Sequence, residues 1–208
     1  MEIRRTANAG VLLKLDGVEI LLDGVCREVK PYSATPPEEI AQLEAKWPDV
    51  VAFTHHHMDH YDPDFAAQYQ KQTNGVVLEP KNTNPVCVDD VTLTPVSSRH
   101  LGAAGKFTSH VSFVIEGSRC VWFMGDSAPL QWRKRNDLPK PDVIIAPYAY
   151  ANTQASWELT KSLGAQYVIL IHLPERELDE VNLFNSVKAA TNLPKELIIP
   201  EIGETIKI

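Results

Sequence analysis

One short segment of the sequence gathers side chains that bind metal ions. Between positions 54 and 60 it carries two alternate histidines, an aspartate and a third histidine: His55, His57, Asp59 and His60. Imidazole nitrogens combined with a carboxylate suit Zn²⁺ and related divalent cations. A zinc-binding helix spaces its histidines four residues apart, whereas alternate histidines are typical of a tight loop at the end of a strand. Because the ligands are packed so closely, the segment predicts a site for more than one metal ion.

Three further residues of the same chemistry occur later in the chain. His100, Asp126 and His172 each stand one or two positions beyond an apolar, strand-like segment. In layered α/β proteins the loops at one edge of a sheet form the ligand-binding crevice, so we expect these strand ends to converge. Gly125 has no side chain and would let the backbone pass close to the ions. These partners argue against the alternative that the histidine-rich segment is merely solvated and binds metal adventitiously.

The elements that must position these residues alternate between strand and helix patterns. An Asp-Gly pair at 16–17 between two apolar segments predicts a tight β-hairpin near the start. A capping-box pattern with proline at the first helical position, at 35–38, predicts a helix. The apolar run 50–54 predicts a buried strand directly before the histidines. Asp62 followed by Pro63 predicts the start of a second helix.

The second half of the chain follows the same alternation. Apolar runs predict strands at 93–98, 111–115, 120–124, 143–146 and 167–171. Helices are expected from about 153 to 163, stopped by Gly164, and from 178 to 190, before strand-like segments at 197–199 and 204–208. Interleaved strands and helices predict a layered α/β protein in which helices cover a mixed sheet, and they argue against an all-β sandwich.

Length and composition suit one soluble domain that spans residues 1–208. Of the 208 residues, 44% are hydrophobic and 23% are charged, close to the average for globular proteins. The chain contains no apolar run of the roughly 18–20 residues that cross a membrane. Its first residues also lack the apolar stretch of a secretory signal. We therefore expect a cytoplasmic protein without membrane association.

Charge and cysteine content bear on the partners and the redox environment. The net charge is −7 and the one dense basic run lies at 133–135, so nucleic-acid binding is not expected as a main task. Cys26, Cys87 and Cys120 are odd in number and widely spaced. This disfavours a disulfide framework and predicts reduced thiols that pack as small core residues. The oligomeric state is left open.

The order of these residues resembles the metallo-β-lactamase superfamily. The pattern H-x-H-x-D-H at 55–60, a later histidine, Gly125-Asp126 and a histidine after a strand recur there, and the hairpin that ends at Asp23-Gly24 is similar as well. The resemblance implies an αββα sandwich, in which two mixed β-sheets lie face to face with helices outside. The short chain most resembles the compact branch that includes ascorbate-6-phosphate lactonase-like proteins and uncharacterised metal-dependent hydrolases.

The resemblance also assigns roles to the seven residues. It implies one metal held by His55, His57 and His100, a second held by Asp59, His60 and His172, and Asp126 as a bridge between both. Relatives with glutamate at the position of His57 tend to hold di-iron for redox work, so this histidine favours hydrolysis.

Three neighbouring residues are expected in other roles. His110 competes with His100 for the third ligand position, but its place just before a strand is typical of a non-ligand histidine in the family, which favours His100. His56 points away from its neighbours in an extended segment, so it is expected behind the ligands or exposed. Asp23 is expected in a turn or in support of a ligand rather than on a metal.

These roles imply a hydrolase that cleaves a small ester, lactone or phosphoester. Two divalent ions, Zn²⁺ above all with Mn²⁺ or Fe²⁺ as alternatives, would supply a bridging hydroxide near neutral pH and polarise the substrate. Asp59 and Asp126 are the expected catalytic residues, and Asp59 would also assist proton transfer. An anionic group on a small-molecule substrate could contact five loop residues: Arg99, Lys106, Arg133, Tyr148 and Tyr150.

Three other functions fit the same ligands. A phosphodiesterase similar to the tRNA 3′-processing nucleases is disfavoured by the acidic balance and by the missing RNA-binding insertion. A metal-stabilised binding or sensor protein would keep the ligands without turnover. A mononuclear iron oxygenase similar to the persulfide dioxygenases uses related ligands, and iron content with oxygen uptake would distinguish it.

Overall fold

Two mixed β-sheets form the centre of the molecule. The computed structural model describes residues 1–102, 105 and 107–208. The first sheet has the strand order β13 (Thr205–Lys207), β1 (Glu2–Arg5), β2 (Val11–Leu15), β3 (Val18–Leu22), β4 (Val50–Ala52) and β5 (Val76–Leu78). The second has the order β12 (Leu197–Ile198), β11 (Tyr167–Ile171), β10 (Val143–Pro147), β9 (Cys120–Phe123), β8 (Val111–Glu116), β7 (Val91–Ser97) and β6 (Val86–Val88). In each sheet a run of antiparallel strands is continued by parallel ones.

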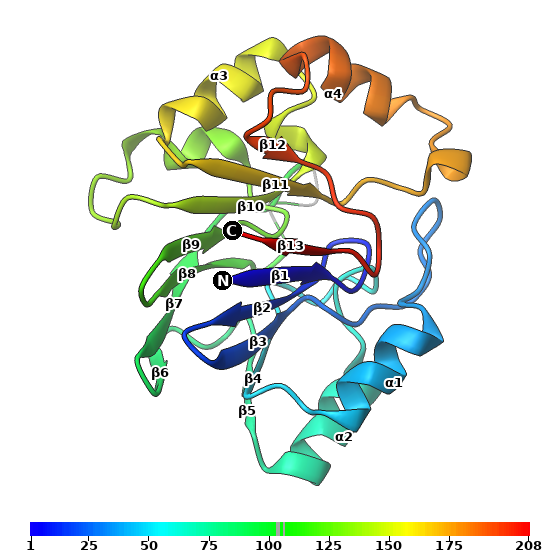
Figure 1. Cartoon of the computed structure of the whole chain (residues 1–208), viewed down its shortest axis with the longest axis vertical. Helices are drawn as coiled ribbons and strands as arrows, with labels where there is room; N and C mark the ends of the chain where they lie inside the picture. Colours follow the sequence, from blue (N-terminus) through cyan, green and yellow to red (C-terminus); the bar gives the residue numbers. More distant parts are fainter. Residues whose placement is uncertain (103–104, 106) are drawn as a thin grey trace.

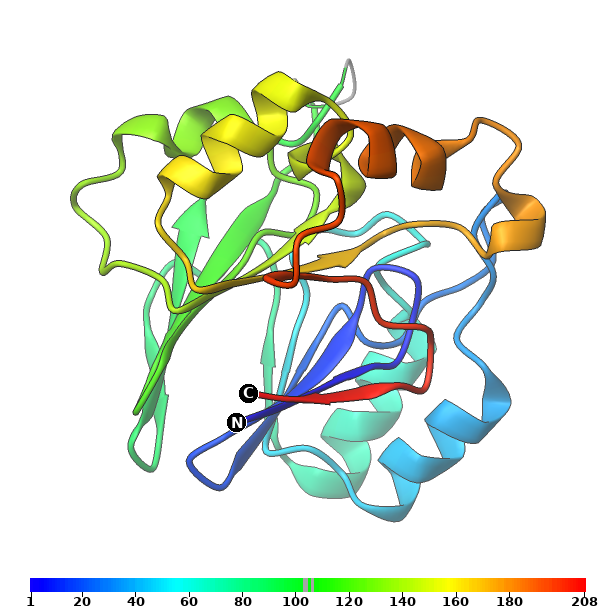
Figure 2. The ribbon, with the colours of Figure 1, turned by 45° about the horizontal axis from the view of Figure 1, so that its top comes forward.

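Helices cover the outer faces of both sheets. α1 (Pro37–Ala45) and α2 (Pro63–Thr73) pack against the first sheet. The second sheet is covered by α3 (Gln154–Ser162), α4 (Leu183–Thr191) and the 3₁₀ helices η2 (Pro129–Lys134) and η3 (Tyr148–Tyr150), with η4 (Arg176–Leu178) before α4. Figures 1 and 2 show these layers, with α1 and α2 on one side and α3 and α4 on the other. The predicted αββα sandwich is confirmed.

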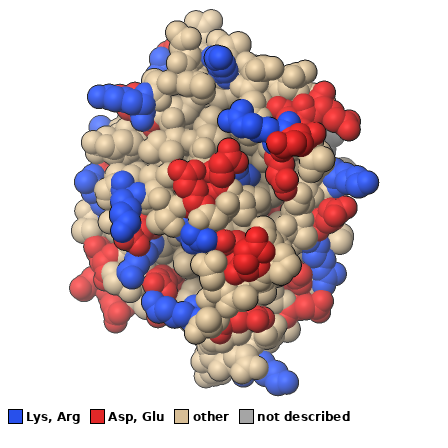
Figure 3. Space-filling view, turned by 45° about the vertical axis from the view of Figure 1, so that its right-hand side comes forward, with Lys and Arg blue, Asp and Glu red and all other residues tan. Residues whose placement is uncertain are grey.

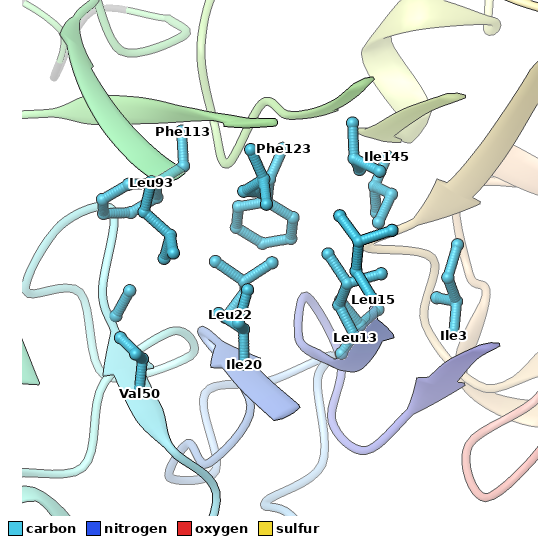
Figure 4. Close-up of a cluster of buried hydrophobic side chains, with 14 of the residues drawn as sticks. Ile3, Leu13, Leu15, Ile20, Leu22, Val50, Leu93, Phe113, Phe123 and Ile145 are labelled. Carbon is cyan, nitrogen blue, oxygen red and sulfur yellow. The ribbon is translucent and has the colours of Figure 1, made fainter. Parts of the chain in front are cut away.

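The main core lies between the two sheets. Alternate residues of the facing strands point inward, and their aliphatic and aromatic side chains interdigitate, as Figure 4 shows for Leu13, Ile20 and Leu22 of the first sheet against Phe113 and Phe123 of the second. All five side chains are fully buried. Because each such side chain stabilises the fold by about 1.5–3 kcal/mol when it leaves water, this layer holds the sheets in one relative position. The loops at the strand ends therefore start from fixed points.

The predicted hairpin joins β2 and β3. Asp16 and Gly17 both adopt positive φ, of 51° and 92°, and the strands pair in register from Leu15 with Val18. Two successive residues with positive φ match the right-handed twist of the flanking strands. The predicted cap of α2 is confirmed as well, since the Asp62 carboxylate accepts the backbone N–H groups of Asp64 and Phe65.

Two predictions about helix starts are wrong. The Thr35 side chain does not cap α1, because its Oγ1 accepts the backbone N–H of Cys26 at 2.8 Å and Pro36 occupies the N-cap position. The helix expected from 178 begins at Leu183. Its first N–H groups donate to the Asp179 carboxylate, and Asn182 adopts a left-handed φ of 56°, so residues 179–182 form a turn.

The cysteine prediction is only partly right, and some strands lacked a detectable pattern. Cys26 is buried, but Cys87 is exposed on β6 and Cys120 is half-buried. Cys87 is exposed because β6 is an edge strand of the second sheet, and one face of an edge strand meets solvent. β1, β5 and β6 have three or four residues each, too few for an alternating pattern to stand out. Among the described residues, no helix is long and apolar enough to cross a membrane.

Candidate metal centre

The segment 54–60 is a loop at the carboxyl end of the buried strand β4. Asp23, which directly follows β3, fixes the start of this loop. Its carboxylate accepts the backbone N–H of Thr54 at 2.7 Å and the Thr54 hydroxyl at 2.6 Å. The loop then turns back on itself, because the N–H groups of His60 and Tyr61 both donate to the carbonyl of His57. Neighbouring side chains are thereby brought to the same side.

Three histidines form a first triad. The ligand atoms of His55, His57 and His100 all lie within 4.8 Å of one another, with His55 Nε2 and His57 Nδ1 3.0 Å apart. His100 donates from Nδ1 to the carbonyl of Leu101 at 2.7 Å, which leaves its Nε2 directed inward. Burial lowers the pKa of His55, so its imidazole is neutral and offers a lone pair.

Asp59, His60 and His172 form a second triad. His172 Nε2 lies 3.3 Å from Asp59 Oδ2, and His60 Nε2 lies 3.9 Å from the same oxygen. Ligands bonded at about 2.0–2.1 Å in tetrahedral directions are about 3.3 Å apart, so these separations fit a Zn²⁺-sized ion. The triad draws on both sheets: His172 follows β11 of the second sheet, whereas Asp59 and His60 lie in the loop after β4 of the first. Figure 1 shows these two strands on different sheets.

Asp126 lies between the two triads. Its Oδ1 is 3.5 Å from Nε2 of both His60 and His172, and its Oδ2 is 3.6 Å from Nε2 of His100. The two oxygens of one carboxylate thus face different triads. Although burial opposes ionisation, the neighbouring imidazoles hold the pKa of Asp126 well below its usual range. The site therefore holds a buried negative charge between the two triads.

Several buried polar atoms of the site lack a hydrogen-bond partner among the described residues. They are Nε2 of His60, His100 and His172, Nδ1 of His172 and Oδ1 of Asp126. An unsatisfied buried polar atom costs roughly 1–3 kcal/mol, and native proteins hold few of them. Apart from Nδ1 of His172, these atoms point to the places where a cation would sit. The donor set and its geometry fit bound divalent metal ions.

His110 lies behind the site and supports it. Its Nε2 accepts the backbone N–H of Asp126 at 3.0 Å, and its Nδ1 pairs with the Ser98 hydroxyl at 2.7 Å. Burial lowers the pKa of His110 to about 3, so the ring stays neutral and can accept this N–H. Both ring nitrogens are engaged. His100, rather than His110, therefore has a ring nitrogen that is free to face His55 and His57.

Asp23 and His56 take the supporting and exposed positions that the sequence suggests. Besides Thr54, the Asp23 carboxylate binds Nδ1 of His60 at 2.8 Å, and both side chains are fully buried. A carboxylate on the far nitrogen of a histidine fixes the tautomer and orientation of the ring. His56 is exposed and packs on Tyr61, with ring centroids 4.7 Å apart.

Gly125 lets the backbone approach the loop that carries the histidines. It has a φ of +51°, and a Cβ at this position would lie 2.6 Å from the Thr54 side chain. The backbone before Asp126 therefore passes close to Thr54. Thr54 follows β4 of the first sheet and Gly125 follows β9 of the second, so the two sheets meet closely at the site.

A buried arginine holds the loop of His172. Arg5 on β1 donates to the backbone carbonyls of Ala7, Asn8, Leu173 and Pro200. The backbone N–H of His172 donates to the same Asn8 carbonyl, at 3.0 Å. His172 itself has a left-handed φ of 59°, which costs energy for a residue with a side chain. Arg5 therefore helps to fix this ligand in an unfavourable backbone conformation.

The residues expected to contact an anionic substrate are scattered. Arg99 is exposed at the start of the His100 loop, and Arg133 lines a surface pocket with Leu163 on the outer side of the second sheet. The Tyr150 hydroxyl is buried against Ser127 at 2.7 Å. Tyr148 remains close to the site, 6.1 Å from the His172 ring. The fifth residue, Lys106, lies outside the described residues.

Sequence reasoning missed Tyr32. Its ring stands edge-on to that of His172, with centroids 4.5 Å apart, and it comes from the segment between β3 and α1. Burial raises the pKa of Tyr32, and the nearby charges of Asp126 and Asp59 raise it further, so the phenol keeps its proton and can donate it. Pro31-Tyr32-Ser33 follows no spacing rule that ties it to the histidines, so the sequence held no signal for it.

Solved structures share the fold. A possible metal-dependent hydrolase from Veillonella parvula has a TM-score of 0.72 at 16% identity, with 100% of this chain and 99% of that chain covered. An isothiocyanate hydrolase from Delia radicum gut bacteria has a TM-score of 0.66 at 18% identity, with coverage of 100% and 99%. CmlA, a diiron β-hydroxylase from Streptomyces venezuelae, has a TM-score of 0.65 at 14% identity and covers 100% of this chain but 54% of its own. At these identities the likeness shows the fold alone.

The family follows from the sequence as a whole. A comparison with curated proteins finds no match. Residues 2–172, which include all seven ligand-type residues, match the family described as the beta-lactamase superfamily domain. The αββα layers and the two triads at one edge of the sheets agree with that match. The chain is a member of the metallo-β-lactamase superfamily.

Proposed function

We propose that the protein is a hydrolase that works with two divalent cations, one at each triad, and cleaves a small ester, lactone or phosphoester. The observation that carries the proposal is the position of Asp126, whose two carboxylate oxygens face different triads at 3.5–3.6 Å. One carboxylate shared by two nitrogen-rich triads is typical of a pair of ions rather than a single one. The nitrogen-rich donor set suits Zn²⁺, with Mn²⁺ and Fe²⁺ as alternatives.

When bound, such a pair of cations supplies a water nucleophile near neutral pH and polarises the scissile carbonyl or phosphoryl group. The chain's own residues hold the geometry for this chemistry. Asp23 keeps the His60 ring turned so that Nε2 faces the second triad, and His110 holds the backbone of Asp126. Tyr32 and Tyr148 stand against His172, where their phenols can donate to an oxygen of the substrate.

Asp59 is the proposed proton carrier. Burial opposes its ionisation, but the imidazoles of His172 and His60 lower the pKa of Asp59, so its carboxylate is deprotonated near neutral pH. The side chain keeps a small exposed fraction, 14%, at the edge of the site. Its Oδ2 can therefore take a proton from the attacking water and pass it to the leaving group.

The similar structures support hydrolysis more than oxidation. Two of them are described as hydrolases, one of them acting on isothiocyanates, while CmlA is a diiron β-hydroxylase. The family resemblance associates redox work with glutamate at the position of His57. A histidine at this position favours the hydrolytic reaction.

The metal proposal is tested by metal content. Wild-type protein loaded with Zn²⁺ and desalted should retain two equivalents by mass spectrometry of the metals. His57→Ala and Asp126→Ala should retain one equivalent or less, because the first removes a donor of one triad and the second removes the group shared by both. His56→Ala is the matched control: the side chain is adjacent but exposed, so two equivalents should remain. Full stoichiometry in both ligand variants would refute the proposal.

The hydrolytic activity is tested on the loaded protein. Chromogenic esters, lactones and phosphoesters should be screened with the wild type, with Asp59→Asn and with His56→Ala. Loss of one general acid–base group lowers kcat by about 10²–10⁴-fold, so Asp59→Asn should lose at least this much on a cleaved substrate. Two bound equivalents without turnover of any substrate class would favour a binding or sensor role instead.

A further inference from the structure

A cleft of about 610 Å³ opens beside the second triad. It lies between two loop segments that are distant in sequence, 28–33 before α1 and 174–181 before α4. Figures 1 and 2 both show these segments side by side, the blue chain after β3 next to the orange η4. The apolar part of the lining consists of Pro31, Tyr32, Pro174, Leu178 and Val181. A cleft of this size can hold a small molecule.

The cleft adjoins the metal centre through Tyr32. Tyr32 lines it and at the same time contacts the ring of His172, with centroids 4.5 Å apart. Pro174, two residues after His172, is also part of the lining. A molecule in the cleft therefore lies against the residue that separates the cleft from the second triad.

The two walls are held in place by hydrogen bonds. Ser33 donates from its hydroxyl to Oε1 of Glu175 at 2.7 Å, which ties one wall to the other. Val29 and Tyr32 exchange backbone hydrogen bonds of 3.0 and 2.8 Å, so the segment that carries Tyr32 is a closed turn. The cleft is thus formed in advance, and a ligand has little ordering to induce.

Large apolar side chains are unusually exposed at this place. Leu178 and Val181 are 42% and 70% exposed, and Val29 beside them is 38% exposed. A single exposed aliphatic residue is ordinary. Here three of them lie on the two facing segments next to a ligand triad, and covering them with an apolar group would be favourable by about 25 cal/mol per Å² of area removed from water.

The charges at the cleft argue against an anionic occupant. The lining contains two carboxylates, Glu28 and Glu180, and one ammonium group, Lys30, so its net charge is negative. Figure 3 shows the side of the molecule that is on the right in Figure 1, and acidic and basic side chains are interspersed there without a basic field. An uncharged group avoids repulsion by the two carboxylates.

We propose that this cleft binds the uncharged apolar group, an alkyl chain or small ring, of the substrate whose scissile bond lies at the triads. This inference rests on the proposed function and specifies its substrate class. The apolar group packs on Pro31, Leu178 and Val181, while Tyr32 contacts the substrate where it enters the metal centre.

Turnover tests the proposal through a series of p-nitrophenyl esters from acetate to octanoate. In the wild type, kcat/KM should rise about 2- to 4-fold for each added methylene until the cleft is filled, mostly through KM. Val181→Asp should weaken this dependence and lower kcat/KM for hexanoate by about 10-fold, because it places a charge among the apolar groups. Val76→Asp is the matched control, since Val76 is 39% exposed but lies on β5, away from the cleft. It should follow the wild-type series.

Binding without turnover separates this proposal from the proposed function. Octan-2-one, an uncharged ketone that cannot be hydrolysed, should receive saturation transfer in NMR from the wild type and from Val76→Asp, and much less from Val181→Asp. If the ketone binds in this way but no ester is hydrolysed, the cleft proposal is supported and the proposed function is refuted. If esters are hydrolysed but kcat/KM does not depend on chain length and the ketone receives no saturation transfer, the cleft proposal is refuted and the proposed function is supported. A dimer in light scattering that Val181→Asp converts to monomer also overturns it, because a second copy then covers the cleft.

Discussion

Asp23 shows how one buried carboxylate prepares the metal centre. It binds three groups at once: the backbone N–H of Thr54, the Thr54 hydroxyl and Nδ1 of His60. Burial raises the pKa of Asp23, and its hydrogen bonds to His60 and Thr54 oppose that rise. A ring held in this way needs no reorientation when a cation binds at Nε2. The residue acts through His60 and has no direct contact with a substrate.

Replacing Asp23 by asparagine should therefore weaken metal binding without removing a ligand. The amide of Asp23→Asn cannot accept all three hydrogen bonds, so the His60 ring loses its fixed orientation. We expect an affinity for the cation at the second triad lower by about 10–100-fold, the usual effect of losing such a partner. Competition with a chromogenic chelator measures it. Asp137→Asn, which alters an exposed aspartate paired with Arg135, serves as control and should change nothing.

At this scale the sequence predicts what is local and misses what depends on packing. His55, His57, Asp59 and His60 are recognisable because they are adjacent, and His100, Asp126 and His172 follow apolar strands. The structure brings all seven together. Tyr32 could not be found in the same way, because its position against His172 depends on how two distant loops pack.

Arg5 connects elements rather than individual ligands. From β1 it reaches four carbonyls that belong to the β1–β2 loop, the segment after β11 and the segment after β12, the last at Pro200. Burial lowers the pKa of Arg5 to about 10, which still leaves it charged near neutral pH. Arg5 thereby satisfies buried backbone carbonyls of three segments, of which Asn8 also accepts the His172 N–H.

Arg5→Met should destabilise the fold and loosen the second triad together. Four carbonyls would lose a donor, so we expect the free energy of unfolding to fall by about 3 kcal/mol, measured by urea denaturation of the metal-free protein. Metal binding at the second triad should also become weaker, because the Asn8 carbonyl that accepts the His172 N–H is no longer held by Arg5. Arg119→Met removes a half-exposed arginine that pairs with Asp142, and it should cost about 0.2–1 kcal/mol, the range for surface ion pairs. Equal losses in the two variants would contradict the role given to Arg5.

The same contrast explains which elements were predictable. The Asp16-Gly17 hairpin and the start of α2 at Asp62 depend on a few neighbouring residues, and the structure agrees with both. The cap at Thr35 and the helix expected from 178 were wrong, because Thr35 binds Cys26 and Asp179 turns the chain before α4. A side chain with two possible partners cannot be assigned from its neighbours alone.

At the scale of the whole molecule, both sheets contribute residues to the metal centre. Asp59 and His60 come after a strand of the first sheet, whereas Asp126 and His172 come after strands of the second. Away from this site, the main core fills the space between the two sheets. The interleaved pattern predicted a mixed sheet, whereas the presence of two such sheets face to face was implied by the family resemblance. Cations at the triads would link the two halves of the sandwich directly.

Removing metal should therefore lower the thermal stability of the whole fold. A cation present at about 1,000-fold above its Kd stabilises the native state by about 4 kcal/mol. For a chain of this length, that corresponds to a fall in Tm of about 10 °C when EDTA removes it. Differential scanning calorimetry before and after chelation measures the shift, and added Zn²⁺ should reverse it. His57→Ala should show a smaller shift than His56→Ala, and an identical Tm with and without chelator would contradict this role.

The division of ligands between the sheets sets an order of events during synthesis on the ribosome. The loop with His55 and His57 is made early, but the first triad waits for His100 and the second waits for His172. The outer edge of β1 also stays unpaired until β13, near the end of the chain, has been made. A nascent chain thus exposes histidines long before it can hold an ion firmly. Cations at the triads would therefore be loaded only after both sheets are complete.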